Sequence, residues 1–161
     1  MLTVSDGVAA GTREDRSGDL LAELLRGEGY AVERRVVADE REAIAAAIRE
    51  LASEARLVLT TGGSGLTPRD VSPEATRDVL DREAPGIAEA LRADSIAKTP
   101  HGLLSRGRAG ALGSTLVVNL PGSTGGCRDG FAVLLPALPH ALELLAGERD
   151  VLHRQTREAA E

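Results

Sequence analysis

The alternation of apolar and polar residues predicts a chain in which strands and helices take turns. Short apolar runs bounded by turn residues, such as Leu57–Thr61 and Thr115–Leu120, are typical of buried strands. Apolar residues three or four positions apart, as in Glu40–Ala55, predict amphipathic helices. The full pattern predicts strands at residues 1–4, 30–37, 57–61 and 115–120, and helices at 17–27, 40–55, 72–82, 85–99, 128–135 and 136–145.

This order of elements predicts an α/β fold: a single doubly wound, mostly parallel sheet with helices on both faces. A chain of 161 residues can bury one core and is too short for two ordinary domains. We expect the domain at residues 1–147 and a polar C-terminal tail at 148–161. The first strand is short for a central one, so we expect that it is truncated or that the natural start lies a few residues upstream.

Composition narrows the classes of partner. Apolar residues make up 42% of the chain and aromatic residues only 1%, so the core must consist of Leu, Val, Ile and Ala. Proteins that bind nucleic acid without sequence preference stack bases on aromatic side chains beside a basic groove, whereas this chain has a net charge of −6. There is no apolar run near the length of a membrane span and no signal-peptide pattern. We therefore expect a cytoplasmic protein that binds neither nucleic acid nor a membrane.

Polar and glycine-rich loops follow three of the predicted strands, at residues 5–18, 62–72 and 121–126. In a parallel sheet, ligands bind at the carboxyl ends of the strands, where these loops lie. Glycine-rich loops that precede helices can hold a phosphate with backbone N–H groups. Neither glycine-rich loop has the lysine of a P-loop or the spacing of a dinucleotide-binding turn. Because such turns are common in α/β proteins, the hydroxyl and charged residues within the loops favour a site more than the glycine spacing does.

Two aspartates that follow predicted strands, Asp70 and Asp39, allow more than one role. Asp70 could ligate Mg²⁺, cap the following helix or pair with Arg69, and for an aspartate taken alone, capping or pairing is the commoner role. Asp39, just after the second predicted strand, has the same alternatives. We expect Ser72 to cap the helix that follows, with Pro73 at its first position.

The histidines and the single cysteine suggest no separate site. His101, His140 and His153 do not have the spacing of metal ligands. Cys127 cannot form an internal disulfide and has no neighbouring histidine or second cysteine in the sequence. We expect an inert thiol at a helix start rather than a nucleophile.

Five motifs together point to one family. They are LTVSD at residues 2–6, EDRSG at 14–18, VLTTGGSGLTPRDVSPEAT at 58–76, LSR at 104–106 and NLPGS at 119–123. In these motifs the chain resembles the molybdopterin-binding proteins of molybdenum cofactor biosynthesis, of the molybdopterin adenylyltransferase type. The resemblance spans residues 2–147, and the longest motif is highly specific. One departure follows NLPGS, where family members often have a proline and a small residue and this chain has Thr124-Gly125-Gly126-Cys127.

The resemblance implies a homotrimer of doubly wound α/β domains that binds molybdopterin, a phosphorylated dithiolene pterin. Adenylyltransferases of this family join molybdopterin to AMP from ATP with Mg²⁺ and release pyrophosphate, and a molybdate-inserting enzyme would be a further partner. The catalytic and metal-binding positions would fall on Asp39 and Asp70. The resemblance assigns substrate binding to Ser5, Asp6, Thr61, Gly62, Gly63, Ser64, Gly65, Arg69, Glu74, Ser105, Asn119, Pro121, Gly122 and Ser123.

Within this assignment, Thr61–Gly65 would hold a nucleotide or pterin phosphate, and Ser105 with Asn119–Ser123 would line the pterin side. For Arg69, an ion pair with Asp70 or Glu74 is an alternative to a phosphate contact. Two other functions compete with the enzyme: a carrier that binds molybdopterin without turning it over, and an unrelated nucleotide-binding domain. Pterin binding that is unaffected by ATP would favour the carrier, and nucleotide binding without pterin binding would favour the unrelated domain.

Overall fold

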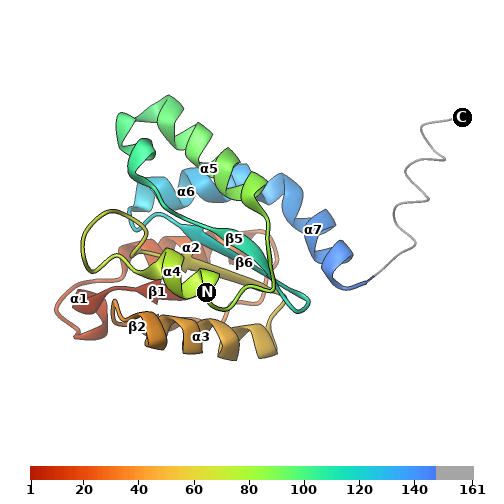
Figure 1. The fold of residues 1–161 in the computed structure, drawn as a ribbon, viewed down its shortest axis with the longest axis horizontal. Coiled ribbons are helices and arrows are strands. Elements are labelled where there is room, and N and C mark those ends of the chain that lie inside the picture. The colour runs from red at the N-terminus through yellow and green to blue at the C-terminus, as the bar shows by residue number, and fades with distance from the viewer. Residues whose placement is uncertain (148–161) are drawn as a thin grey trace, which may run out of the picture.

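A six-stranded sheet in the order β2-β1-β3-β6-β5-β4 forms the centre of the protein (Figure 1). The computed structural model describes residues 1–147, and the predicted tail at 148–161, with His153, lies outside them. The strands are β1 (Leu2–Val4), β2 (Arg35–Val37), β3 (Leu57–Thr61), β4 (Arg82–Glu83), β5 (Ala109–Leu112) and β6 (Thr115–Leu120). The helices are α1 (Asp6–Ala9), α2 (Arg16–Gly27), α3 (Arg41–Glu54), α4 (Ser72–Arg77), α5 (Pro85–Lys98), α6 (Thr124–Leu134) and α7 (Leu138–Leu145), with short 3-10 helices η1 (Pro100–Leu104) and η2 (Leu135–Ala137).

The sheet is mostly parallel, as predicted. Strands β2, β1, β3 and β6 run parallel, and β5 and β4 continue the sheet antiparallel beyond β6. The chain moves outward from β1 to β2 and returns to β3 on the other side of β1. The loops after β1 and β3 therefore diverge at this topological switch point and leave a crevice at the carboxyl ends of the strands.

Helices cover both faces of the sheet, and each face has its own core. Successive residues of a strand point to opposite faces, so on β6 Val117 packs against the α3 and α4 side while Leu116 and Val118 pack against the α2, α6 and α7 side. Figure 1 shows α6 and α7 across the sheet from α3. Among residues 1–147, no helix is long and apolar enough to cross a membrane.

Several element boundaries differ from the prediction. Residues 30–34 are not in a strand, and only Arg35–Val37 pairs with β1. The helix predicted at 72–82 ends at Arg77, and α6 begins at Thr124 rather than near residue 128, because Ser123 caps a first turn rich in glycine. Helix α1, η1 and strands β4 and β5 were not predicted. The sequence of β5, Ala-Gly-Ala-Leu, lacks β-branched residues, and its strand conformation comes from pairing with β6.

Candidate functional site

Two pockets adjoin at the carboxyl edge of the sheet. The larger, of about 880 Å³, lies at the switch point between β1 and β3 and is called the switch-point pocket. The smaller, of about 570 Å³, lies beside α5, η1 and α6 and is called the α5 pocket. Four residues line both pockets: Gly63, Asp70, Gly122 and Ser123. A ligand that fills both pockets would therefore cross the glycine-rich loops that follow β3 and β6.

Most of the predicted site residues line these pockets. Those that do are Ser5, Asp39, Thr61, Gly62, Gly63, Ser64, Gly65, Asp70, Ser105, Asn119, Pro121, Gly122 and Ser123. Asp6, Arg69 and Glu74 are not among the residues of the described chain that line either pocket. Each of these three forms an ion pair instead.

The switch-point pocket combines helix N-termini and arginines with several carboxylates. The N-termini of α2 and α6 lie in its wall, at Arg16 and Thr124, and the first turns of helices carry backbone N–H groups without helical partners. Arg13 also lines this pocket. The prediction missed these basic residues, although the EDRSG motif contains Arg16.

The same wall also holds four carboxylates, those of Glu14, Asp15, Asp39 and Asp70. Arg16 pairs with Glu14, and Asp15 caps the N-terminus of α2. A phosphate in this pocket would therefore bind together with a cation that offsets the carboxylates.

Asp39 faces the switch-point pocket and is held by the loop after β1. The backbone N–H of Asp6 donates to Asp39 Oδ2 at 2.7 Å, and the N–H of Asp39 donates to Asp6 Oδ1 at 3.0 Å. Burial raises the pKa of the Asp39 carboxyl above its ordinary value. A carboxylate that loses hydration on folding gains more from a cation than an exposed one does.

Arg69 pairs with Asp6. Its guanidinium donates from Nη2 to Asp6 Oδ1 at 2.8 Å and from Nε to Oδ2 at 3.0 Å. Hydrogen bonds from Arg69 hold the pKa of the Asp6 carboxyl below its ordinary value. The ion pair with Asp70 or Glu74, the alternative to a phosphate contact for Arg69, is therefore wrong, because the loop after β3 folds toward the end of β1.

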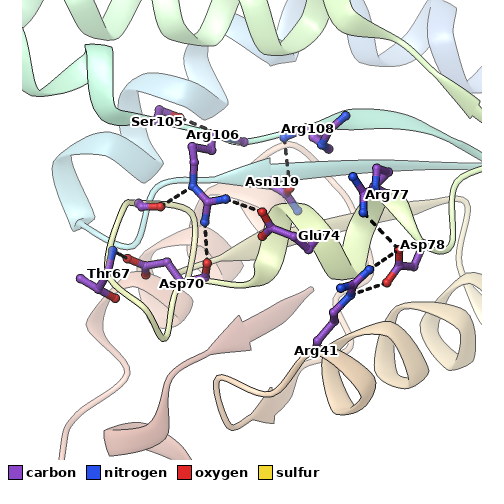
Figure 2. Close-up of polar contacts among 12 residues, drawn as sticks. Arg41, Thr67, Asp70, Glu74, Arg77, Asp78, Ser105, Arg106, Arg108 and Asn119 are labelled. Atoms are coloured by element: carbon purple, nitrogen blue, oxygen red, sulfur yellow. Dashed lines mark hydrogen bonds and ion pairs between the residues drawn. The ribbon is translucent and has the colours of Figure 1, made fainter.

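Asp70 has neither of the commoner roles considered for it. Its Oδ2 accepts from the backbone N–H of Thr67 at 2.7 Å, so the carboxylate closes a turn within its own loop (Figure 2). Helix α4 has Val71 at its N-cap and no side-chain cap, so neither Asp70 nor Ser72 caps it. Ser72 Oγ instead donates to the carbonyl of Gly62 at 2.9 Å. Among the described residues Asp70 forms no ion pair, and it is one of the residues that line both pockets.

The predicted hydroxyl and amide groups mostly hold the loops together. Thr61 Oγ1 donates to the carbonyl of Pro121 at 2.9 Å, which joins the loops after β3 and β6. Asn119 is buried; its Nδ2 donates to the hydroxyls of Thr60 and Thr76, and its Oδ1 accepts from the N–H of Arg108. These hydrogen bonds fix the ends of β3 and β6, and Thr61 and Asn119 also line the pockets.

The α5 pocket has an apolar wall and a charged rim. Ala88, Leu91 and Leu104 line it beside Ser105. At the rim, Lys98 bridges two carboxylates, with Nζ 2.9 Å from Asp94 Oδ2 and 3.2 Å from Asp129 Oδ1. The prediction missed these residues because apolar spacing along α5 and α6 does not indicate which charged side chains meet. A flat, mostly apolar ring with polar edges fits such a pocket.

Cys127 is expected to be unreactive in the folded protein. Its side chain is fully buried, and burial raises the pKa of the thiol to about 11. At pH 8 a thiol with this pKa is ionised on the order of 100-fold less than an ordinary cysteine, and the thiolate is the reactive form. Iodoacetamide should therefore alkylate the native protein at least about 100-fold more slowly than the protein unfolded in urea, as followed by mass spectrometry. Equal rates would contradict the inert role predicted for this residue.

Comparison with known proteins shows the family to which the chain belongs. A sequence profile described as "Probable molybdopterin binding domain" matches residues 1–140. The molybdopterin adenylyltransferase of Helicobacter pylori J99 is 35% identical over 152 residues, which cover 91% of this chain and 86% of that protein. The molybdenum cofactor biosynthesis bifunctional protein of Chlorobaculum tepidum is 40% identical over 150 residues, or 92% of this chain. The molybdopterin biosynthesis enzyme MoaB of Thermus thermophilus has a similar structure, with a TM-score of 0.85 and 47% identity over 91% of this chain and 94% of that one.

The matched proteins differ in length. The chain spans 48% of the Chlorobaculum tepidum protein and between 22% and 47% of three other long curated relatives. It spans 83% to 86% of the relatives named molybdopterin adenylyltransferase. The same fold therefore occurs both as most of a short protein and as one part of longer ones.

Proposed function

The chain belongs to the molybdopterin-binding domain family of molybdenum cofactor biosynthesis, and from this premise we propose that it is a molybdopterin adenylyltransferase. It would transfer AMP from ATP to the phosphate of molybdopterin and release pyrophosphate. The observation that carries this proposal is the placement of Asp39 and Asp70 in one pocket with the N-termini of α2 and α6. Relatives of similar length that bear the name molybdopterin adenylyltransferase support it.

The carboxylates at the switch-point pocket fit Mg²⁺ bound together with a nucleotide. Within residues 1–147, no group of three or more His, Cys, Asp or Glu side chains is placed to hold a metal ion alone. Magnesium at nucleotide sites, however, is held by one or two carboxylates together with phosphate oxygens and water. Asp39 and Asp70 would hold the ion, which would neutralise charge on the triphosphate.

We assign the two substrates to the two pockets by their chemistry. The triphosphate of ATP suits the switch-point pocket, with its helix N-termini and arginines, and the pterin ring suits the apolar wall of the α5 pocket. The reacting phosphates would then meet at the residues that line both pockets, Gly63, Asp70, Gly122 and Ser123. The glycines there let the backbone approach the phosphates closely.

In the proposed reaction, a phosphate oxygen of molybdopterin attacks the α-phosphorus of ATP. The new P–O bond forms as the bond from the α-phosphorus to the oxygen bridging the β-phosphorus breaks, and pyrophosphate leaves with that electron pair. A phosphate monoester is largely ionised at neutral pH because its second pKa is about 6, so the reaction needs no general base. The chain's residues would position both phosphates and offset their charge, as is usual in phosphoryl transfer.

The test is pyrophosphate release from ATP by the purified protein with freshly prepared molybdopterin and Mg²⁺. We expect release that requires all three components, because each supplies a part of the reacting assembly. The carrier alternative predicts molybdopterin binding without release, and binding that ATP and Mg²⁺ leave unchanged. An unrelated nucleotide-binding domain would bind ATP but not molybdopterin.

We also propose a homotrimer in the cytoplasm and a molybdate-inserting enzyme as a partner. Longer relatives named as bifunctional proteins of molybdenum cofactor biosynthesis support the partner, because they join this fold to a further part of the same pathway. Light scattering coupled to size-exclusion chromatography measures the oligomeric state. A monomer at micromolar concentration would contradict the trimer.

A further inference from the structure

The loop after β3 is closed by an arginine from a distant segment. The guanidinium of Arg106 lies between this loop and Glu74 (Figure 2). Its Nε donates to the carbonyl of Gly65 at 2.6 Å and its Nη2 to the carbonyl of Asp70 at 2.5 Å. The backbone N–H of Arg106 donates to the carbonyl of Ser64 at 3.0 Å. One residue thus ties together both ends of the segment 64–70.

The third nitrogen of the same guanidinium pairs with Glu74. Arg106 Nη1 donates to Glu74 Oε1, and both side chains are about one-third exposed. Burial opposes ionisation of Glu74, but hydrogen bonds from Arg106 and from the backbone hold the pKa of this carboxyl below its ordinary value. The other carboxylate oxygen, Glu74 Oε2, is buried without a hydrogen-bond partner. The carboxylate therefore relies on Arg106, and the ion pair anchors the loop to the first turn of α4.

These contacts use the geometry of arginine and not only its charge. The planar guanidinium directs its donors along three separate lines, to two carbonyls and a carboxylate. A lysine ammonium at the same place would carry the charge but could not span the three acceptors from one fixed plane.

We propose that Arg106 is a positioning residue for the transfer reaction, which it serves by fixing Asp70. It holds the Asp70 carbonyl directly, and Asp70 is one of the residues that line both pockets. Its sequence neighbours Ser105 and Gly107 line the α5 pocket. Arg106 thereby connects the proposed pterin pocket to the carboxylate proposed to hold Mg²⁺. This inference rests on the proposed function.

The experiment compares Arg106→Gln and Arg106→Lys with the control Arg108→Gln. Arg108 lies two residues away, pairs with Glu83 at the surface, and does not line either pocket. Arg108→Gln therefore removes the same positive charge as Arg106→Gln but at a position outside the pockets. Pyrophosphate release is measured against Mg²⁺ and molybdopterin concentration. Both Arg106 variants should lower kcat and raise the half-saturating Mg²⁺ concentration by about 10-fold or more, with KM for molybdopterin within about threefold of the parent. Arg108→Gln should match the parent.

A role in folding alone predicts a different pattern. It would lower the melting temperature and the amount of active protein, but the surviving protein would keep the parent's Mg²⁺ dependence. Rescue by Arg106→Lys, or a parent-like Mg²⁺ dependence in Arg106→Gln, overturns the proposal. If the Arg106 variants do not fold, Glu74→Gln is measured in the same way, since it weakens the anchor while keeping its shape, and it should raise the Mg²⁺ requirement.

A second measurement separates this inference from the proposed function. Calorimetry measures the affinity of each variant for ATP with Mg²⁺, without molybdopterin. If the parent releases no pyrophosphate, the proposed function fails, but a loss of Mg²⁺-dependent ATP affinity of about 10-fold in Arg106→Gln, absent in Arg108→Gln, still supports the role of Arg106. Equal affinities in these two variants overturn it.

Discussion

Asp70→Asn is expected to lower pyrophosphate release about 100-fold or more, while molybdopterin binding stays within about twofold of the parent. The substitution removes the negative charge that would hold Mg²⁺ at the wall between the pockets. Its amide oxygen can still accept the hydrogen bond from the N–H of Thr67, so the loop should keep its shape. Asp70 forms no ion pair among the described residues, so the loss of charge leaves no buried partner behind.

The control for this variant is Asp78→Asn. Asp78 pairs with Arg41 away from both pockets, so its substitution also removes one charge but should leave release unchanged. The measurement is the rate of release with saturating ATP and molybdopterin over a range of Mg²⁺ concentrations. Full activity of Asp70→Asn would remove Asp70 from the proposed chemistry and leave it with the turn that it closes at Thr67.

Gly62→Ala is expected to destabilise the fold by at least about 3 kcal/mol. Gly62 has a backbone φ of +98°, a conformation that residues with a side chain rarely adopt. A Cβ added there would lie 2.2 Å from the carbonyl oxygen of Val4. That oxygen belongs to the backbone of β1, which cannot move without disturbing its pairing with β2 and β3. The substitution therefore strains the place where the two central strands end.

Gly29→Ala separates the two causes of this loss. Gly29 has a φ of +83° but nothing within 4 Å of an added Cβ, so its substitution should cost only about 1 kcal/mol. Urea unfolding of both variants gives the free energies of unfolding. The difference between the two losses of unfolding free energy measures the cost of the clash with β1. Equal losses in the two variants would show that backbone conformation alone requires glycine at position 62.

Much of the fold could be predicted because its signals are local. Strands β3 and β6 are short, mostly apolar runs, and α2, α3 and α5 carry apolar residues at helical spacing. Strand β5 could not be predicted in this way, because its small residues have little strand propensity of their own and depend on pairing with β6. Helix α1 is a single turn of four residues, too short for any periodicity to appear.

The candidate site could be predicted only as far as its loops. Asp39 and Asp70 follow predicted strands, and the rule that ligands bind at the carboxyl ends of parallel strands brought both to one edge of the sheet. The same rule did not reach Arg106, which lies in a segment without a predicted element between α5 and β6. The LSR motif was the one sequence signal that included Arg106. The motif does not indicate which hydrogen-bond acceptors the Arg106 side chain contacts.

The sequence by itself determined the class of fold, the family, and the loops that carry the candidate chemistry, because apolar periodicity and glycine-rich motifs are local properties of the chain. The tertiary structure decided which charges meet: Arg69 with Asp6, and Arg106 with Glu74. These partners are 63 and 32 residues apart, respectively. Long charged side chains can reach several carboxylates from one position, and the choice among them depends on how the connected strands are ordered in the sheet. Sequence spacing alone does not contain that order.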